Sequence, residues 1–251
     1  MPNTTDIAQA LINAHENGTR ITPDWDVLPR AQVLAIQSRV SAALGPVTGF
    51  KVGHAADGGP PIIAPIQSRY RVAGGGTRIV ADCLGVELEI GFTLTQPLPA
   101  ATLPPRPQDY FVPCIALELV DTRLTGDAAT RTDLKFADFQ INAGLVLGPA
   151  MPAWDGSDFG TQDAWLGTEA QVTLDGPATV PGGSALANLA LLLAHLGDHC
   201  GGLQVGQTVI TGSLCGLPWF TPDAIVTGWI AGFGEVSINL QAANPASETD
   251  L

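Results

Sequence analysis

The segment CLGVELEIGF at residues 83–92 constrains the fold most, because its side chains change character with the period of a β-strand. Successive side chains of a strand point to opposite faces, so Val86, Leu88 and Ile90 share one face and Glu87 and Glu89 share the other. Two like charges on a half-buried face repel each other and lose hydration. The segment therefore predicts a strand whose acidic face meets something that offsets two negative charges.

A third carboxylate lies in a similar run, CIALELVD at residues 114–121. There Glu118 shares a strand face with Ala116 and Val120, and pairing of the two strands would bring three carboxylates together. A hard divalent cation would offset their charge, and ligation by oxygen alone suits Mg²⁺ or Mn²⁺ better than zinc. The spacing leaves an alternative open, in which the glutamates line a solvated sheet face or pair with arginines such as Arg78, Arg106 or Arg123.

Composition excludes several classes of protein. The chain of 251 residues is 45% hydrophobic and 14% charged, which favours a compact, turn-rich fold over disorder. A net charge of −13 argues against nucleic acid as a partner, and an anionic substrate would need a metal or a local cation to hold it. There is no apolar run of about 18 residues, so we expect no membrane partner. Four cysteines without CxxC spacing and an N-terminus unlike a secretory signal favour reduced thiols and a cytoplasmic protein.

Periodicity divides the chain into two parts. Helical spacing of apolar residues predicts helices at about 5–17 and 30–44, ended by Gly18 and by Gly45-Pro46. Beyond residue 46, short apolar runs separated by Gly and Pro predict strands, with one further helix at 184–199. These strand-like runs are 47–53, 77–94, 110–121, 143–148, 169–176, 207–214, 223–230 and 234–240. We therefore expect an α+β protein with a helical part at 1–46 and a β-rich domain at 47–251.

Five motifs occur in an order found in a known family: GFKVG at 49–53, GVELEIGFTL at 85–94, ALELVDTR at 116–123, ADFQINAGLVLG at 137–148 and VITGSL at 209–214. In this order the chain resembles the 2-keto-4-pentenoate hydratases and the related 4-oxalocrotonate decarboxylases of the fumarylacetoacetase superfamily. The resemblance implies a mixed β-barrel or β-roll built around a metal site, and it covers most of the chain.

The resemblance also implies roles for individual residues. Glu87, Glu89 and Glu118 match the family's three metal ligands for Mg²⁺ or Mn²⁺. Lys51 matches the lysine of the G-x-K-x-G strand, as a proton donor or a group that holds the substrate carboxylate. The segment Thr211, Gly212 and Ser213 matches one that approaches the substrate. The implied reaction is hydration of a 2-hydroxy-2,4-dienoate, a small anionic 2-oxo acid, to a 4-hydroxy-2-oxo acid, with the metal polarising the C2 oxygen.

The chain departs from the family pattern at residues 54–76, which form a shorter segment in which His54 stands where the family often has LTS. The family's ADN motif is here Ala137-Asp138-Phe139. These departures leave a C–C hydrolase of acylpyruvates, a 2-oxo acid decarboxylase, or a non-catalytic homologue that serves a partner decarboxylase as alternatives. A homo-oligomer is expected as well.

The sequence also offers expectations for two histidines, for an ion pair beside Glu118, for the pKa of Lys51 and for one tryptophan. His195 and His199 have a zinc-binding spacing but lack the Glu of HExxH, which favours a helix-end role. We expect Asp121 and Arg123 to form an ion pair that braces Glu118, and Lys51 beside a metal to have a lowered pKa. Trp219 is a candidate for a pocket wall, with core or interface as its alternatives.

Overall fold

Residues 3–55 and 58–243 are described by a computed structural model of the chain. Ala56 and Asp57, within the segment 54–76 that departs from the family pattern, lie outside the described residues. The described α-helices are α1 (Thr4–Asn17), α2 (Arg30–Leu44), α3 (Thr132–Ala137) and α4 (Ala185–Leu196).

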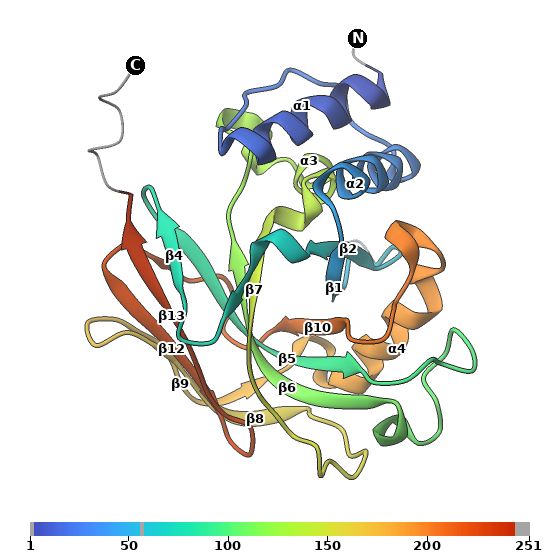
Figure 1. Cartoon of the computed structure of the whole chain (residues 1–251), viewed down its shortest axis with the longest axis vertical. Coiled ribbons are helices and arrows are strands. Elements are labelled where there is room, and N and C mark those ends of the chain that lie inside the picture. The colour runs from blue at the N-terminus through green and yellow to red at the C-terminus, as the bar shows by residue number, and fades with distance from the viewer. Residues whose placement is uncertain (1–2, 56–57, 244–251) are drawn as a thin grey trace.

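The larger sheet carries most of the residues of interest. Its strands run in the order β2-β1-β10-β5-β6-β7-β3, and β11 extends it by pairing with β5 (Figure 1). Their bounds are β1 Val47–Gly53, β2 Ile62–Gln67, β3 Arg71–Ala73, β5 Leu84–Leu94, β6 Phe111–Val120, β7 Asn142–Ala150, β10 Thr208–Ser213 and β11 Trp219–Phe220. The long antiparallel pair β5–β6 lies at the centre of this curled sheet.

A smaller sheet packs against one face of the larger one. Its order is β4-β13-β12-β8-β9, with bounds β4 Thr77–Val80, β8 Thr161–Gly167, β9 Val172–Thr179, β12 Ala224–Ile230 and β13 Gly234–Ala242. Leu88 and Leu117 of the larger sheet meet Val226 and Ile238 of the smaller one in the main hydrophobic core, where Leu189 of α4 joins them. The sheets approach closely at Gly228, where an added Cβ would lie 2.7 Å from Leu88 Cδ1.

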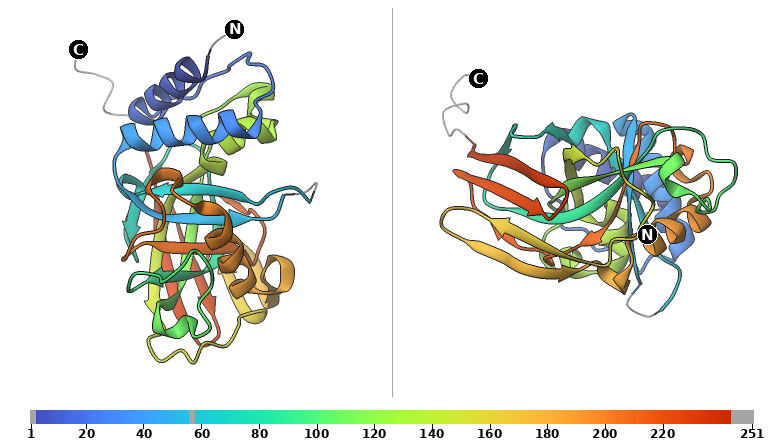
Figure 2. Two further views of the ribbon diagram at one scale, coloured as in Figure 1. Left: turned by 90° about the vertical axis from the view of Figure 1, so that its right-hand side faces the viewer. Right: turned by 90° about the horizontal axis from the view of Figure 1, so that it is seen from below.

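The helices α1, α2 and α3 form a layer at one end of the strands, as Figure 1 and the left view of Figure 2 show. They share a second hydrophobic cluster that includes Leu11, Ile36 and Phe136. Helix α1 begins at a capping box of Asn3 and Asp6 and ends at Gly18, whose φ of 62° is left-handed.

The expected α+β fold with a curled sheet and a few helices is confirmed. The helix expected at 184–199 ends earlier, at Leu196, because Gly197 leaves helical geometry. The run 77–94 divides into β4 and β5, and the strands β2, β3, β8 and β11 were not expected. Among the described residues, no helix has the length and apolar character needed to cross a membrane.

Candidate metal centre

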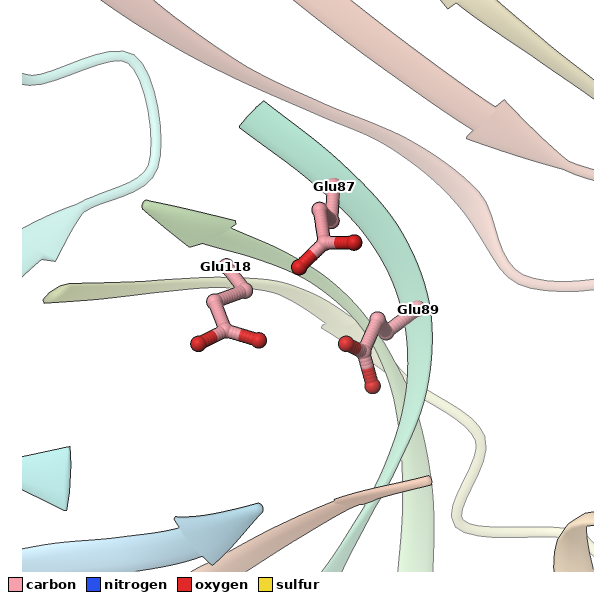
Figure 3. Close-up of side chains that lie close together, drawn as sticks. All are labelled: Glu87, Glu89 and Glu118. Carbon is pink, nitrogen blue, oxygen red and sulfur yellow. The ribbon is translucent and has the colours of Figure 1, made fainter. Parts of the chain in front are cut away.

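Strands β5 and β6 place three carboxylates side by side on one face of the larger sheet. Glu87 lies directly opposite Glu118 in the register, and Glu89 lies opposite Ala116. The even-numbered residues of β5 face the main core, so the glutamates face the other way. One ligand atom from each of the three lies within 4.8 Å of the others, and the carboxylates point toward a common space (Figure 3).

Burial makes these negative charges unfavourable. Glu89 is 2% exposed and Glu118 is fully buried. Loss of hydration, followed by the negative charge of Glu118, raises the pKa of Glu87 to about 7. The same two causes, with Glu87 as a third, raise the pKa of Glu89 well above its ordinary value. Without a cation, the centre would therefore hold protons that a metal must displace.

Lys51 of β1 supplies one positive charge to this centre. Its Nζ lies 2.5 Å from Glu118 Oε1, and its side chain is 13% exposed. Burial lowers the pKa of Lys51, but the charges of Glu118, Glu87 and Glu89 outweigh burial and raise it overall. This direction holds for the metal-free centre, and the lowered pKa expected for Lys51 beside a bound metal stays a prediction.

One oxygen of Glu118 is bonded and the other is free. Oε1 accepts hydrogen bonds from Lys51 Nζ and from Asn142 Nδ2, the latter at 2.8 Å. Oε2 is buried and has no hydrogen-bond partner among the described residues. An unpaired buried carboxylate oxygen is unfavourable unless a cation or donor meets it. Since the three side chains offer only oxygen donors, the centre fits a hard divalent cation.

Asn142 is held by a turn whose backbone is unusual. Phe139, Gln140 and Ile141 have φ of 53°, 50° and 56°, the left-handed region that non-glycine residues rarely adopt. The guanidinium of Arg123 closes this turn, since Nη2 donates to the carbonyls of Asp138 and Asn142. The Arg123 backbone N and Nε donate to the Asp138 carboxylate at 3.0 and 2.7 Å.

This network corrects the expected pairing around Glu118. Arg123 pairs with Asp138, and Asp121 pairs with Arg20 instead, at 2.7 Å. Glu118 is braced by Asn142, which sequence reasoning missed. Asn142 lies three residues after Phe139, at the start of β7, and its position opposite Val120 of β6 is a matter of register alone.

The arginine alternative for the glutamates is wrong. Arg78 lies over the ring of Tyr70, and Arg106 pairs with Asp109. Among the ion pairs of the described residues, only Lys51–Glu118 includes one of the three glutamates.

The segment 211–213 borders the carboxylates on the β10 side. Gly212 N donates to Glu89 Oε2 at 2.6 Å, which fixes the orientation of that carboxylate. The buried Thr211 hydroxyl donates to Ile90 O and holds β10 against β5. Ser213 Oγ donates to Gly216 O, and the hydroxyl lies close enough to Glu87 to lower its pKa against the larger effect of burial. The substrate-binding role of this segment stays a prediction.

His54 lies outside the carboxylate cluster. Its Nε2 is 2.8 Å from Asn188 Oδ1 at the start of α4. The Asn188 amide donates to the carbonyls of Pro181 and Thr211, so its oxygen must accept and His54 Nε2 must carry a proton. His54 thus ties β1 to α4 and to the segment 211–213.

The remaining candidates have structural contacts. His195 Nδ1 meets Leu191 O in the last turns of α4, which agrees with a helix-end role. His199 Nε2 meets Gln37 Oε1 at 2.8 Å, so the two histidines do not form a zinc site. All four cysteines are free thiols, and Cys114 is buried.

The arrangement as a whole can hold a cation and an anion together. With every group ionised, three carboxylates and one ammonium carry −3 + 1 = −2, the charge that one divalent cation neutralises. A ligand that shares the cation would then meet a neutral centre and an ammonium donor, which offsets the repulsion from the chain's net charge of −13.

Comparison with known proteins shows likeness at the level of structure. Neither a protein-family model nor a curated protein matches the chain. The structure of 4-oxalocrotonate decarboxylase from Pseudomonas putida G7 complexed with calcium and acetate matches with a TM-score of 0.76 and 18% identity, covering 94% of this chain and 96% of that one. The same enzyme complexed with magnesium and adipate matches with a TM-score of 0.74 and 17% identity, covering 94% and 97%.

A shorter match is 5-carboxymethyl-2-hydroxymuconate delta-isomerase from Mycobacterium smegmatis, with a TM-score of 0.54, 17% identity and 79% of each chain covered. These likenesses confirm the fold expected from the motifs, because the chain shares its fold with these structures.

Proposed function

We propose, for a chain with this fold, a divalent-metal-dependent lyase that acts on small unsaturated 2-oxo acids and hydrates a 2-hydroxy-2,4-dienoate to a 4-hydroxy-2-oxo acid. The observation that carries the proposal is the set of three converging carboxylates, one of which has a buried oxygen with no hydrogen-bond partner in the part of the chain that the structure describes. Burying three carboxylates in this way destabilises the fold unless a cation binds between them.

Glu87, Glu89 and Glu118 would hold Mg²⁺ or Mn²⁺. When bound, the ion would polarise the C2 oxygen of a substrate that also binds through its carboxylate. Gly212 N and Lys51 Nζ would keep two of the three ligands in place, since each donates to one carboxylate. Two structures that match nearly the whole chain are complexed with calcium or magnesium, which supports a divalent metal here.

The hydration moves protons that a residue must handle. Ketonisation takes the proton from the C2 hydroxyl and adds one at C5, which leaves a C3–C4 double bond conjugated with the C2 carbonyl. Water then adds across that bond, with hydroxide at C4 and a proton at C3. Lys51 is the ammonium in contact with the carboxylate cluster, so we assign to it the donation of a proton or of a hydrogen bond to the developing negative charge on the substrate.

Decarboxylation is a second candidate, favoured by the likeness over nearly the full length to 4-oxalocrotonate decarboxylase. In that reaction the C–C bond to the leaving carboxylate breaks, its electrons enter the conjugated enolate, and a proton replaces carbon dioxide. The same metal and the same ammonium group would serve this reaction, because negative charge develops at the C2 oxygen in both reactions and both groups would stabilise it.

The test is turnover of two substrates by protein stripped of metal and reloaded with Mg²⁺. Hydration predicts loss of the dienol absorbance of 2-hydroxypenta-2,4-dienoate, with 4-hydroxy-2-oxopentanoate as product. Decarboxylation predicts release of carbon dioxide from 2-oxohex-3-enedioate. Glu89→Gln, which keeps the shape but removes a charge, should abolish either activity. If the reloaded wild type consumes neither compound, the proposed lyase function is wrong.

A further inference from the structure

The carboxylate face of β5 carries no side chain of its own at Gly85, two residues before Glu87 on the same face of the strand. A side chain there would project beside Glu87, about 7 Å away along the strand. Leu217 takes that place instead, since a Cβ added to Gly85 would lie 2.6 Å from Leu217 Cδ1 and 3.0 Å from Val120 Cβ.

A second large apolar side chain, that of Trp219 of β11, lies at the same place, because Trp219 pairs with Gly85. Its neighbour Phe220 pairs with Leu84 and is buried in the main core. Because side chains alternate, Trp219 faces the carboxylate side. The preceding loop is fastened to β5, since Leu214 N donates to Leu88 O and Val86 N donates to Pro218 O. Leu217 and Trp219 nevertheless remain 36% and 42% exposed.

Positive charge is scarce at this end of the site. Lys51 is already bonded to Glu118, and two arginines are paired, Arg20 with Asp121 and Arg123 with Asp138. Arg78 lies over the ring of Tyr70. A second carboxylate on the substrate would therefore find, in the described part of the chain, an apolar wall instead of a cation.

We propose that Leu217 and Trp219 form a subsite for the distal end of the substrate, and that this subsite selects 2-oxo acids with one carboxylate and an apolar tail over dicarboxylates. The inference rests on the proposed function, because the tail is placed by an acid group bound at the carboxylate cluster. It favours hydration of a dienoate monoanion over decarboxylation of an enedioate dianion. Leu217 and Trp219 are specificity residues in this account and take no part in proton transfer.

The test compares ligands of equal length that differ at the far end. Calorimetry with the Mg²⁺-loaded protein measures 2-oxopentanoate against 2-oxoglutarate, with oxalate as a ligand that has no tail. We expect 2-oxopentanoate to bind at least tenfold more tightly than 2-oxoglutarate, because burial of its terminal methyl group is worth about fourfold in affinity and an unpaired carboxylate in the same place loses its hydration. Equal binding, or a preference for 2-oxoglutarate, would overturn the inference.

Variants of Leu217 and Trp219 test whether these two side chains cause the preference for 2-oxopentanoate. Trp219→Ala should weaken 2-oxopentanoate about tenfold and leave oxalate unchanged. Trp229→Ala is the matched control, because Trp229 is 40% exposed on β12 of the other sheet. Leu217→Arg should reverse the preference in favour of 2-oxoglutarate. Equal effects of Trp219→Ala and Trp229→Ala, or no reversal in Leu217→Arg, would count against the subsite.

Oxalate binding distinguishes failure of the subsite from failure of the proposed function. If oxalate binds with Mg²⁺ but the tails are not distinguished, the subsite is wrong and the metal centre stands. If oxalate does not bind at all, the proposed function has failed and the subsite is overturned with it.

Discussion

The affinity of the centre for Mg²⁺ should fall as the pH is lowered from 8 to 6, because the metal must displace a proton from Glu87. The pKa of Glu87 in the metal-free protein is about 7, raised first by burial and then by Glu118. The ionised fraction of such a group is about 0.9 at pH 8 and about 0.1 at pH 6, so the apparent association constant should drop about tenfold, or about 1.4 kcal/mol. The raised pKa of Glu89 acts in the same direction and makes tenfold a lower bound.

Calorimetric titration at pH 6, 7 and 8, in buffers of different ionisation enthalpy, measures both the affinity and the protons released. The account predicts release of about one proton or more per metal at pH 6 and less at pH 8. Glu87→Gln should bind Mg²⁺ more weakly and with a flatter dependence on pH. An affinity that does not change between pH 6 and pH 8, or a wild type and Glu87→Gln with the same slope, would refute the reasoning.

Three further predictions follow from the same contacts. Replacement of Asn142 by Leu removes a hydrogen bond to a charged oxygen of Glu118 and should reduce metal affinity by about 2 kcal/mol. Gln67→Leu, at another buried amide that donates to Ser41, should not change it, and calorimetry on both variants distinguishes a positioning role from general destabilisation. Removing the buried charge of Asp138 with Asn leaves Arg123 without its partner and should lower the free energy of unfolding by about 3 kcal/mol, as measured by urea denaturation; a change below about 1 kcal/mol would contradict it. The raised pKa of Glu87 means that the folded metal-free protein holds a proton that the unfolded chain releases, so this group's contribution to stability is present below about pH 4.5 and is lost as the pH rises through about 7. Thermal unfolding should therefore show a larger stabilisation by Mg²⁺ at pH 8 than at pH 6. An equal shift of the unfolding temperature at both pH values would oppose this prediction.

The two carboxylate strands were readable from the sequence because their signal is local. The alternation around Glu87 and Glu89 needs only the period of a strand, and three carboxylates come to one side of the sheet once two such strands are neighbours. That Glu87 lies directly opposite Glu118 is a matter of register, which the structure supplies. Helix ends at Gly18 and Gly45 were readable for the same reason, since glycine adopts the backbone angles that end a helix.

The support of the centre was not readable, because it depends on contacts between distant residues. Asp121 lies two residues from Arg123, yet it pairs with Arg20 across about a hundred positions of sequence, and Arg123 turns to Asp138. The left-handed turn at residues 139–141 has no glycine to announce it, and it persists because Arg123 closes it from outside. The unexpected strand β2 contains Pro65, which sequence rules place at sheet edges, and β2 is indeed an end strand of its sheet.

The most direct test of the metal centre is a crystal of the protein grown with Mn²⁺ and measured for anomalous scattering at the manganese edge. The account predicts one strong peak on the carboxylate face of β5 and β6, with oxygens of Glu87, Glu89 and Glu118 at about 2.1 Å from it, and no such peak in Glu89→Gln. No peak at the three carboxylates of the wild type, or manganese bound only elsewhere, would contradict the central claim.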